Sequence, residues 1–236
     1  MTLWAGIAEA LRREITEGAR MPGDRLPTEA ALARRFGVNR HTVRRALAAL
    51  GEEGLVRSRR GTGSFVTAAP TRYPLGPRTR YHRDLRAAGR LPAKRLLALE
   101  TRPATAEEAE DLLLERGAPV HAAEGISLAD GRPVALFLSV FPGWLEGLPA
   151  ALRAPPSMSV TAALRACGVA DYARAWSRIT AVAAAAPEAV LLELAAGAPL
   201  IQVEGVNRAP DGRPVERGRA RFAGERVALT ADYEAS

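Results

Sequence analysis

Cationic and hydrogen-bonding side chains gather at residues 39–45, which read Asn-Arg-His-Thr-Val-Arg-Arg. Arginine can donate two parallel hydrogen bonds to guanine, and asparagine can form a matching pair with adenine. A helix with such residues in its first turns can lie in the major groove of DNA, with those residues on the base edges. The pattern therefore predicts sequence-specific contact with DNA. The alternative is a solvated basic helix in an ordinary helical pair.

Two helical patterns, separated by residues 37–39, would position these side chains. Their apolar residues fall three or four positions apart: Ala30, Leu32, Ala33 and Phe36 in the first, and Val43, Ala46, Leu47 and Leu50 in the second. Thr28 and Asn39 stand at the N-cap positions, where a side chain can accept a backbone N–H. A short glycine-containing turn between two helices is typical of a helix-turn-helix. A further helical pattern at residues 2–18 would complete a three-helix core.

A basic segment follows these helices, flanked by apolar pairs at residues 55–56 and 65–66. This arrangement predicts a two-stranded wing whose flexible tip approaches phosphates or the minor groove. The residues predicted to contact DNA are Thr28, Asn39, Arg40, His41, Thr42, Arg44, Arg45, Arg59, Arg60, Gly61, Thr62 and Gly63.

The charge distribution agrees with a nucleic-acid partner. The 236-residue chain has a net charge of +7, and residues 1–70 contain 12 arginines against seven acidic residues. The positive excess thus lies mainly where the helix-turn-helix is predicted, as a DNA-binding surface requires. Lys94 is the only lysine, a bias that a GC-rich genome would explain.

Other features of the composition limit the class of protein. Hydrophobic residues make up 47% of the chain and charged residues 25%, which is ordinary for a globular protein. The sequence has no apolar run long enough to cross a membrane and no leader pattern. Cys167 is the only cysteine, and no Cys/His spacing fits a zinc site. We therefore expect a cytoplasmic protein without a metal or cofactor.

Residues 67–77 are rich in proline and glycine and predict a linker, and the pattern changes beyond them. Strands are expected at residues 94–100, 120–128, 133–141, 175–185, 200–207, 215–222 and 227–230, the last ending the sheet, and helices at 105–116, 160–167 and 187–194. The order helix, Gly-Ala-Pro, strand, Asp-Gly-Arg-Pro-Val, strand occurs twice, at residues 115–119 and 130–134 and again at 195–199 and 211–215. Shared turn chemistry could explain each motif alone, but the repeated order predicts a duplicated α+β unit with an antiparallel sheet.

Three clusters of polar residues in this second region could bind a small anion. Arginines bind phosphate or phosphonate through paired hydrogen bonds, and a helix N-terminus with nearby hydroxyls offers further donors. The predicted effector-binding residues are Arg78, Thr79, Arg80, Ser159, Thr161, Tyr172, Arg174, Glu216 and Arg221. Glu216 would accept from a ligand hydroxyl or amine, or would fix an arginine. As alternatives, a surface arginine is often only solvated, and Ser159 would only cap its helix.

The N-terminal residues resemble a known family. Residues 26–56, LPTEAALARRFGVNRHTVRRALAALGEEGLV, and residues 59–66, RRGTGSFV, are similar to the DNA-binding domain of GntR-type bacterial regulators. The repeat region resembles the UTRA ligand-binding domain, whose fold is like chorismate lyase and which accompanies that module in the HutC subfamily. Residues 78–89, 159–181 and 212–227 look like PhnF-type regulators of phosphonate metabolism.

The resemblance implies a two-domain α/β protein. Residues 1–68 would form a winged helix-turn-helix, residues 69–77 a linker, and residues 78–236 an α+β antiparallel-sheet UTRA domain for effector binding and dimerisation. In sugar-phosphate-binding relatives a strand carries an Arg-x-Arg pair, where this chain has Gly125 and Ser127. This departure counts against a sugar-phosphate effector.

Together these features predict a regulator, most simply a repressor, of phosphonate utilisation or transport genes. A homodimer would bind double-stranded operator DNA with an inverted repeat, and a small anionic effector, such as a phosphonate or another phosphorus compound, would release it. The alternatives are a HutC-type repressor of another catabolic pathway, an enzyme in the C-terminal domain, and a constitutive architectural DNA binder. Against an enzyme, the sequence has no nucleophile elbow, glycine-rich phosphate loop or paired carboxylate motif.

Overall fold

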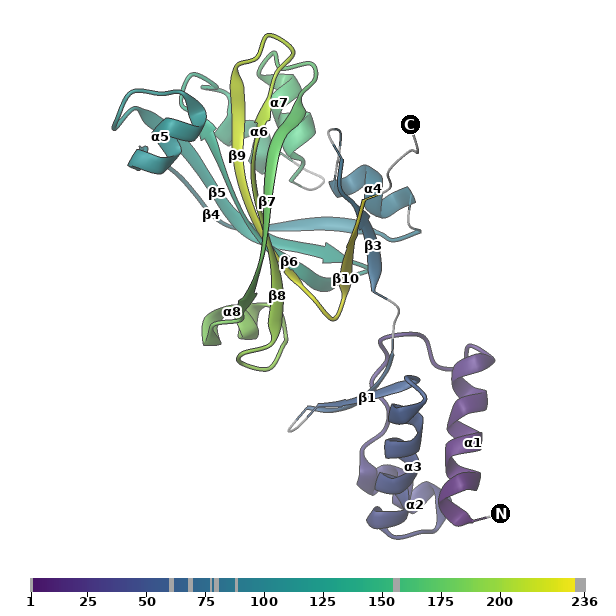
Figure 1. Cartoon of the computed structure of the whole chain (residues 1–236). Helices are drawn as coiled ribbons and strands as arrows, with labels where there is room; N and C mark the ends of the chain where they lie inside the picture. The colour runs from purple at the N-terminus through teal and green to yellow at the C-terminus, as the bar shows by residue number, and fades with distance from the viewer. Residues whose placement is uncertain are drawn as a thin grey trace. The chain divides into compact units, whose positions relative to one another are not determined.

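The computed structural model describes residues 2–59, 62–67, 70–76, 78, 81–87, 89–154 and 158–231 (Figure 1). The chain divides into two compact units, residues 1–69 and residues 70–236. No described helix is long and apolar enough to cross a membrane.

The N-terminal unit is a three-helix core followed by a two-stranded hairpin. Its elements are α1 (Leu3–Thr16), α2 (Glu29–Phe36), α3 (Arg40–Glu52), β1 (Val56–Arg59) and β2 (Gly63–Val66). Gly37 follows α2 in the left-handed conformation (φ 65°), which glycine adopts without strain. The hairpin is antiparallel, with Val56 opposite Val66, and an isolated bridge joins Arg25 to Phe65.

The apolar positions predicted from helical spacing form the core of this unit, except Ala30, which is only partly buried and is not part of the core cluster. Leu32 of α2 is fully buried, and the buried residues of α3 are Val43, Ala46, Leu47 and Leu50. They pack with Ile7 and Leu11 of α1 and with the two valines of the hairpin. Burial of each large aliphatic side chain contributes about 1.5–3 kcal/mol, so this core fixes which face of α3 points outward.

The C-terminal unit is built on an antiparallel sheet in the order β4-β5-β6-β9-β8-β7. The strands are β4 (Pro92–Pro103), β5 (Pro119–Ala129), β6 (Arg132–Pro142), β7 (Ala173–Ala183), β8 (Pro199–Arg208) and β9 (Pro214–Ala223). Each half has one strand, a short helix and then a hairpin, and the halves meet where β6 pairs with β9. The antiparallel sheet is as predicted, and its mirrored strand order agrees with the duplication inferred from the repeated motifs.

The helices of this unit are short. They are α4 (Tyr81–Ala87), α5 (Ala106–Leu112), α6 (Leu148–Arg153), α7 (Val160–Ala166) and α8 (Ala186–Leu191). The prediction of a helix to residue 116 is wrong, because Leu113 takes a left-handed conformation (φ 54°) and ends α5. The helix expected at residues 187–194 likewise ends at Leu191.

Two predictions near the ends of this unit are wrong. Residues 71–74, assigned to the linker, form β3 (Thr71–Pro74). The last strand, β10 (Val227–Thr230), pairs in parallel with β3 and so belongs to a separate two-stranded sheet. Parallel pairing between the two ends of one unit is a long-range contact that local patterns do not encode. The pairing brings the start of the unit beside its C-terminal strand (Figure 1).

Candidate nucleic-acid interface and effector cavity

The exposed residues of α3 form one stripe along the helix. Along residues 40–48 they are Arg40, His41, Arg44, Arg45 and Ala48, at spacings of one, three and four residues, opposite the buried apolar face; Gly51 and Glu52 are exposed at the end of the helix. Residues four apart lie above one another on a helix, so these side chains point to the same side. Two turns of α3 therefore offer cations and hydrogen-bond donors to a partner.

The other predicted residues at this helix start hold the backbone in place. The Asn39 side chain accepts hydrogen bonds from the Thr42 N–H and the Thr42 hydroxyl, both at 2.9 Å. Thr28 accepts the Ala31 N–H at 3.2 Å and caps α2. Each cap contributes about 1 kcal/mol to helix stability. Thr28, Asn39 and Thr42 thus set where α2 and α3 begin.

Two arginines of the exposed stripe have partners within the unit. The Arg44 guanidinium lies 3.1 Å from the Glu29 carboxylate, and Arg45 stacks 4.8 Å from the centre of the Trp4 ring. Both contacts are at the surface, where an ion pair or cation–π contact is worth about 1 kcal/mol or less. Such contacts orient the side chains without preventing them from exchanging partners with DNA.

The wing is only partly described. Arg60, Gly61 and the Arg59 side chain lie outside the described residues, so the predicted role of the tip stays a prediction. Thr62 is exposed, and Gly63 has a φ of 111°, a conformation that favours glycine. A Cβ at Gly63 would lie 3.0 Å from Nε of Arg25, so a larger residue would disturb the base of the wing.

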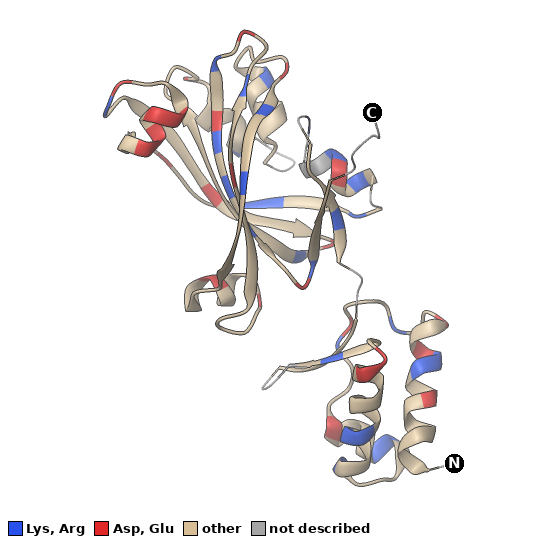
Figure 2. Cartoon of the chain, viewed as in Figure 1, with Lys and Arg blue, Asp and Glu red and all other residues tan. Residues whose placement is uncertain are grey.

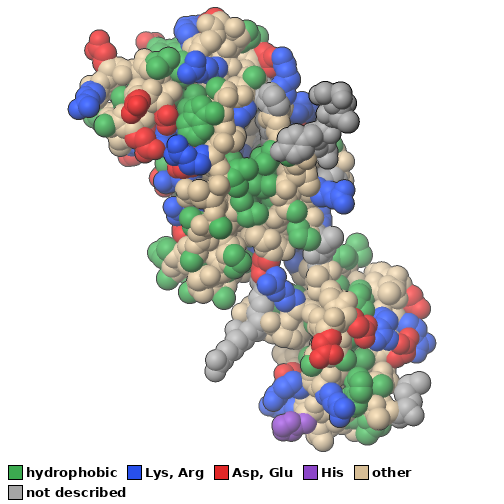
Figure 3. All heavy atoms as spheres, in the orientation of Figure 1, with side chains coloured by type: hydrophobic (Ala, Val, Ile, Leu, Met, Phe, Trp, Pro, Cys, Tyr) green, Lys and Arg blue, Asp and Glu red, His purple; other side chains and the backbone are tan. Residues whose placement is uncertain are grey.

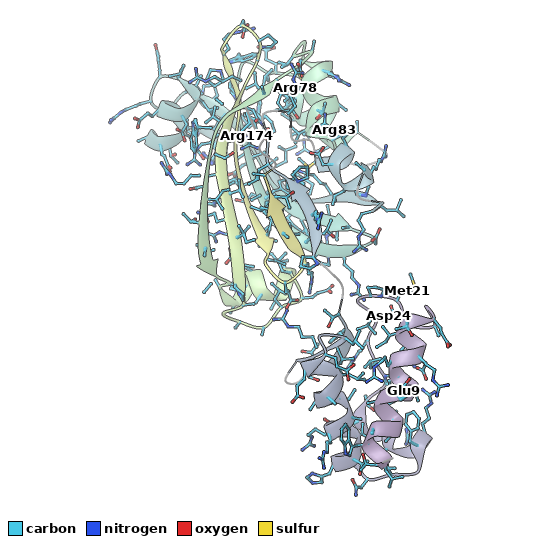
Figure 4. All side chains as sticks on the ribbon, turned by 45° about the vertical axis from the view of Figure 1, so that its right-hand side comes forward. Glu9, Met21, Asp24, Arg78, Arg83 and Arg174 are labelled. Carbon is cyan, nitrogen blue, oxygen red and sulfur yellow. The ribbon has the colours of Figure 1, made fainter. Side chains whose placement is uncertain are left out.

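A cavity of about 650 Å³ lies in the C-terminal unit against one face of the sheet. Its lining includes six of the nine predicted effector-binding residues: Arg78, Ser159, Thr161, Tyr172, Arg174 and Glu216. Arg78, Arg83 and Arg174 come from the segment after β3, from α4 and from β7, and they lie at one end of the unit (Figure 4). Thr79 and Arg80 lie outside the described residues. The cavity size suits a small molecule.

The described lining of the cavity is predominantly basic. Seven arginine and lysine residues line it against two acidic residues, Asp171 and Glu216. Asp171 pairs with Arg78, which leaves most of the positive charge facing the cavity. On the face of the C-terminal unit drawn in Figure 3, apolar side chains gather at the middle and basic side chains flank them. A basic cavity attracts anions.

Glu216 is a buried carboxylate at the cavity wall, with 7% of its surface exposed. It accepts a hydrogen bond from the Ser139 hydroxyl at 2.7 Å and another from the Asn207 amide at 2.6 Å. A carboxylate has about four acceptor positions, so capacity remains for a ligand donor. Elsewhere in the cavity lining, the hydroxyls of Thr161 and Tyr172 are 2.8 Å apart and form a hydrogen bond.

Ser159 has a structural role as well as a place in the cavity lining. Its hydroxyl accepts the Ala162 N–H at 3.3 Å and caps α7. The helix has seven residues, which makes its N-terminus a weak source of anion-binding dipole.

Lys94 lines the cavity and was not among the predicted effector-binding residues. Its ammonium lies 4.1 Å from the centre of the Phe137 ring. Burial lowers the pKa of Lys94 to about 8, and the nearby Glu216 carboxylate opposes this shift. One feature of the sequence could have drawn attention to Lys94: it is the only lysine among 33 basic residues.

Arg221 lies away from the described cavity lining, although Glu216 is on the same strand. Alternate residues of a strand face opposite sides of a sheet, so Arg217 and Arg221 lie on the side away from Glu216, although Arg219 of the same strand still reaches the cavity lining. Arg221 donates to Gln202 of β8 at 2.8 Å and pairs with Glu188 of α8. Burial opposes the change, but hydrogen bonds from the Ala185 N–H and from Arg221 lower the pKa of Glu188. The structure therefore gives Arg221 a role in holding α8 to the sheet.

Arg217, on the same strand as Arg221, also pairs with a carboxylate of a covering helix. Only 7% of its side chain is exposed, and its Nε donates to Asp111 of α5 at 2.7 Å. A second carboxylate of α5, that of Glu107, also pairs with Arg217. Figure 2 shows the acidic residues of α5 beside the basic positions of the strands. Burial opposes the shift, while these carboxylates raise the pKa of Arg217.

An exposed basic helix in a winged three-helix unit, followed in the chain by a unit with a basic cavity, is typical of a ligand-responsive transcription factor. Residues 3–66 match the family model for bacterial regulatory proteins of the gntR family, and residues 87–228 match the model for the UTRA domain. The chain belongs to the GntR family of transcriptional regulators and carries a UTRA domain.

Similar proteins cover nearly the whole chain. An HTH-type transcriptional regulator of Rhizobium meliloti, RB1450, is 40% identical over 97% of this chain and 94% of its own length. The probable transcriptional regulator PhnF of Escherichia coli is 31% identical over 98% of this chain and 95% of its own length. The crystal structure of PhnF from Mycobacterium smegmatis superposes with a TM-score of 0.67 at 29% identity, covering 98% of this chain and all of that chain.

Proposed function

We propose that this protein is a repressor of genes for phosphonate utilisation or transport. It binds its operator through α3 and the wing, and a small anionic effector that enters the cavity releases it. The observation that carries the proposal is the pairing of an exposed cationic stripe on α3 with a cavity lined by seven basic and two acidic residues. The alternative is a repressor of the same subfamily that controls another catabolic pathway through a different effector.

The stripe on α3 supports the DNA-binding half of the proposal. Its arginines suit guanine and its spacing lets several side chains reach one groove. A homodimer would place two such helices on an inverted repeat, because the two-fold axis of the protein matches that of the operator.

The cavity supports the effector half. Phosphonates resemble phosphate, whose oxygens arginine binds through paired hydrogen bonds. The similarity of residues 78–89, 159–181 and 212–227 to PhnF-type regulators points to the same class of ligand. Release of DNA requires that the effector bind the DNA-incompetent arrangement more tightly than the DNA-competent one.

A gel-shift experiment on the DNA upstream of the protein's own gene tests this proposal. The full chain should retard the fragment, and a phosphonate such as methylphosphonate or 2-aminoethylphosphonate should release it. Inorganic phosphate is a further phosphorus probe, and acetate serves as the ligand control. A complex that persists with every phosphorus compound overturns the phosphonate assignment, whereas failure to retard any fragment that carries the operator overturns the DNA-binding assignment.

A further inference from the structure

The only lysine of the chain lies in the cavity. Every other basic residue among the 33 is an arginine, so Lys94 is the single ammonium side chain in a chain that otherwise uses guanidinium groups. An ammonium differs from a guanidinium in two ways that matter here: it is a compact point charge, and it can lose its proton when buried. A lysine at this position can therefore change its charge with pH, which an arginine cannot.

The geometry around Lys94 fixes its ammonium over an aromatic ring. Lys94 pairs across β4 and β5 with Ser127, two residues from Gly125. A Cβ at Gly125 would lie 2.6 Å from the Phe137 ring, so only glycine lets that ring lie against the sheet. The ring in turn supports the Lys94 ammonium at 4.1 Å. Gly125 and Ser127 carry no charge, so Lys94 supplies the positive charge at this part of the cavity.

The second half of the sheet presents a matching cation. Arg174 of β7 pairs with Asn207 of β8, two residues from Gly205, just as Lys94 pairs with Ser127. A Cβ at Gly205 would lie 2.5 Å from Nη1 of Arg174, so this glycine makes room for the guanidinium. Lys94 and Arg174 therefore occupy equivalent positions in the two halves of the duplicated unit, and both line the same cavity.

We propose that Lys94 and Arg174 together bind the anionic end of the effector, a tetrahedral phosphorus oxyanion, and that Lys94 makes this binding depend on pH. The inference rests on the proposed function and deepens it. Arg174 supplies a permanent charge with paired donors, and Lys94 supplies a charge that is present only while its amine is protonated.

The groups that surround Lys94 set the direction of this dependence. Glu216 of β9 favours the ammonium, while the burial of Lys94 disfavours it and lowers the pKa of Lys94 to about 8. The other charged or titratable groups of the cavity wall are Tyr73 of β3, Arg78 before α4, Arg83 and Arg86 of α4, Arg165 of α7, Asp171 and Tyr172 before β7, Arg174 of β7, and Arg219 of β9. A bound dianion adds negative charge beside the amine and raises its pKa. Binding should therefore take up a proton near pH 8 and weaken as the pH rises above 8.

The sole lysine makes a direct measurement possible. The full-length chain labelled with ¹³C at lysine Cε has one such signal, whose shift against pH gives the pKa of Lys94. Saturating inorganic phosphate, methylphosphonate or 2-aminoethylphosphonate should each raise that pKa by one unit or more. Acetate, which is not tetrahedral and carries one charge, should move it less. If none of the three phosphorus probes moves the titration at millimolar concentration, the proposal is overturned.

Variants separate Lys94 from the rest of the cavity. Lys94→Met should weaken the binding of the phosphorus probe at pH 7 at least tenfold by calorimetry, and Lys94→Arg should remove the change in affinity between pH 7 and pH 9. Arg95→Met is the matched control, because Arg95 is the exposed neighbour on the same strand. Circular dichroism establishes that each variant is folded.

The outcomes distinguish this proposal from the proposed function. Unchanged affinity in Lys94→Met, with wild-type release of DNA by the same probe, overturns the role of Lys94 and leaves the repressor intact. Loss of operator binding in the wild type would instead overturn the repressor, whatever happens to the lysine signal.

Discussion

Arginines serve opposite purposes on two surfaces of this molecule. On α3, Arg40 and Arg45 are exposed, and among the described residues neither forms an ion pair with a carboxylate. On the outer face of the C-terminal sheet, Arg217 and Arg221 are each held by a carboxylate from a covering helix. The first surface keeps its cations available for a partner, and the second uses them to attach α5 and α8.

The role of an arginine in this protein therefore depends on whether a carboxylate lies beside it. Strand β9 carries both kinds of residue. Glu216 lines the cavity, whereas Arg217 and Arg221 pair with acidic residues of α5 and α8 on the other face of the sheet. Substitutions on the two kinds of surface should therefore affect different measurements.

Replacement of Arg40 and Arg45 together by alanine should weaken operator binding about 100-fold or more. Each good side-chain contact with a base is worth about 1–3 kcal/mol, and the two positions lie on one stripe. The measurement is a gel shift on the upstream fragment. Arg116 and Arg132, exposed on the C-terminal unit, form the charge-matched control, and their double alanine variant should bind normally. Equal losses in both variants would show that net charge alone governs binding.

Replacement of Arg217 by methionine should lower the free energy of unfolding by about 2 kcal/mol. Breaking a fully buried ion pair costs about 3–5 kcal/mol, and the partial exposure of Asp111 reduces that figure. Urea denaturation gives the stability, and calorimetry gives the affinity for the phosphorus anion. We expect the affinity of the folded variant to stay within twofold. A tenfold loss of affinity at unchanged stability would contradict the division between the two faces.

Replacement of Arg221 by methionine should cost about 1 kcal/mol of stability, because its ion pair with Glu188 is partly exposed. Effector affinity should hardly change. The informative contrast is Arg174→Met, which removes a cation from the cavity lining and should weaken binding about tenfold. If Arg221→Met weakens binding as much as Arg174→Met, our assignment of Arg221 to the fold is mistaken.

A smaller, pH-dependent effect should come from His121. This side chain is buried, with Nδ1 at 2.8 Å from the Thr101 hydroxyl. Burial lowers the pKa of His121, while the backbone of Gly143 and Leu145 opposes the shift. An unfolded histidine titrates near pH 6.5, so the unfolded chain binds the proton first, and stability should fall as the pH drops below about 6.5.

The contribution of His121 is limited to about 1.4 kcal/mol per pH unit, the value for one group. His121→Leu should flatten the dependence of the unfolding free energy between pH 6.5 and pH 5. Exposed His41 supplies the control, and His41→Ala should leave that slope unchanged. A slope identical in all three proteins would assign the acid sensitivity to other groups.

Local patterns gave most of the architecture. Helical spacing located α2 and α3 and their buried faces, and the Asp-Gly hairpins located the pairs β5–β6 and β8–β9. The parallel pairing of β3 with β10 was missed because its register joins residues more than 150 positions apart, from Thr71 to Val227. Such pairing depends on the closed tertiary structure rather than on either strand alone.

The candidate cavity was harder to predict than the α3 stripe. A stripe follows from sequence spacing along one helix, whereas the cavity gathers side chains from strands and helices distant in sequence. Lys94 was missed because a lysine on a predicted strand carries no local sign of what faces it. Arg221 was predicted to bind the effector because it lies on the same strand as Glu216. Alternation along the strand places the two side chains on opposite faces.

The salt dependence of operator binding tests the central claim most directly. If the exposed arginines of α3 and the wing neutralise DNA phosphates, the affinity of the full-length chain should fall steeply between 50 and 200 mM salt, by about 0.9 logarithmic units per tenfold change in salt for each phosphate contact. The Arg40→Ala, Arg45→Ala double variant should bind more weakly at every salt concentration. Two results would contradict DNA contact by α3: an operator affinity that does not change with salt, or equal affinities in the wild type and the double variant.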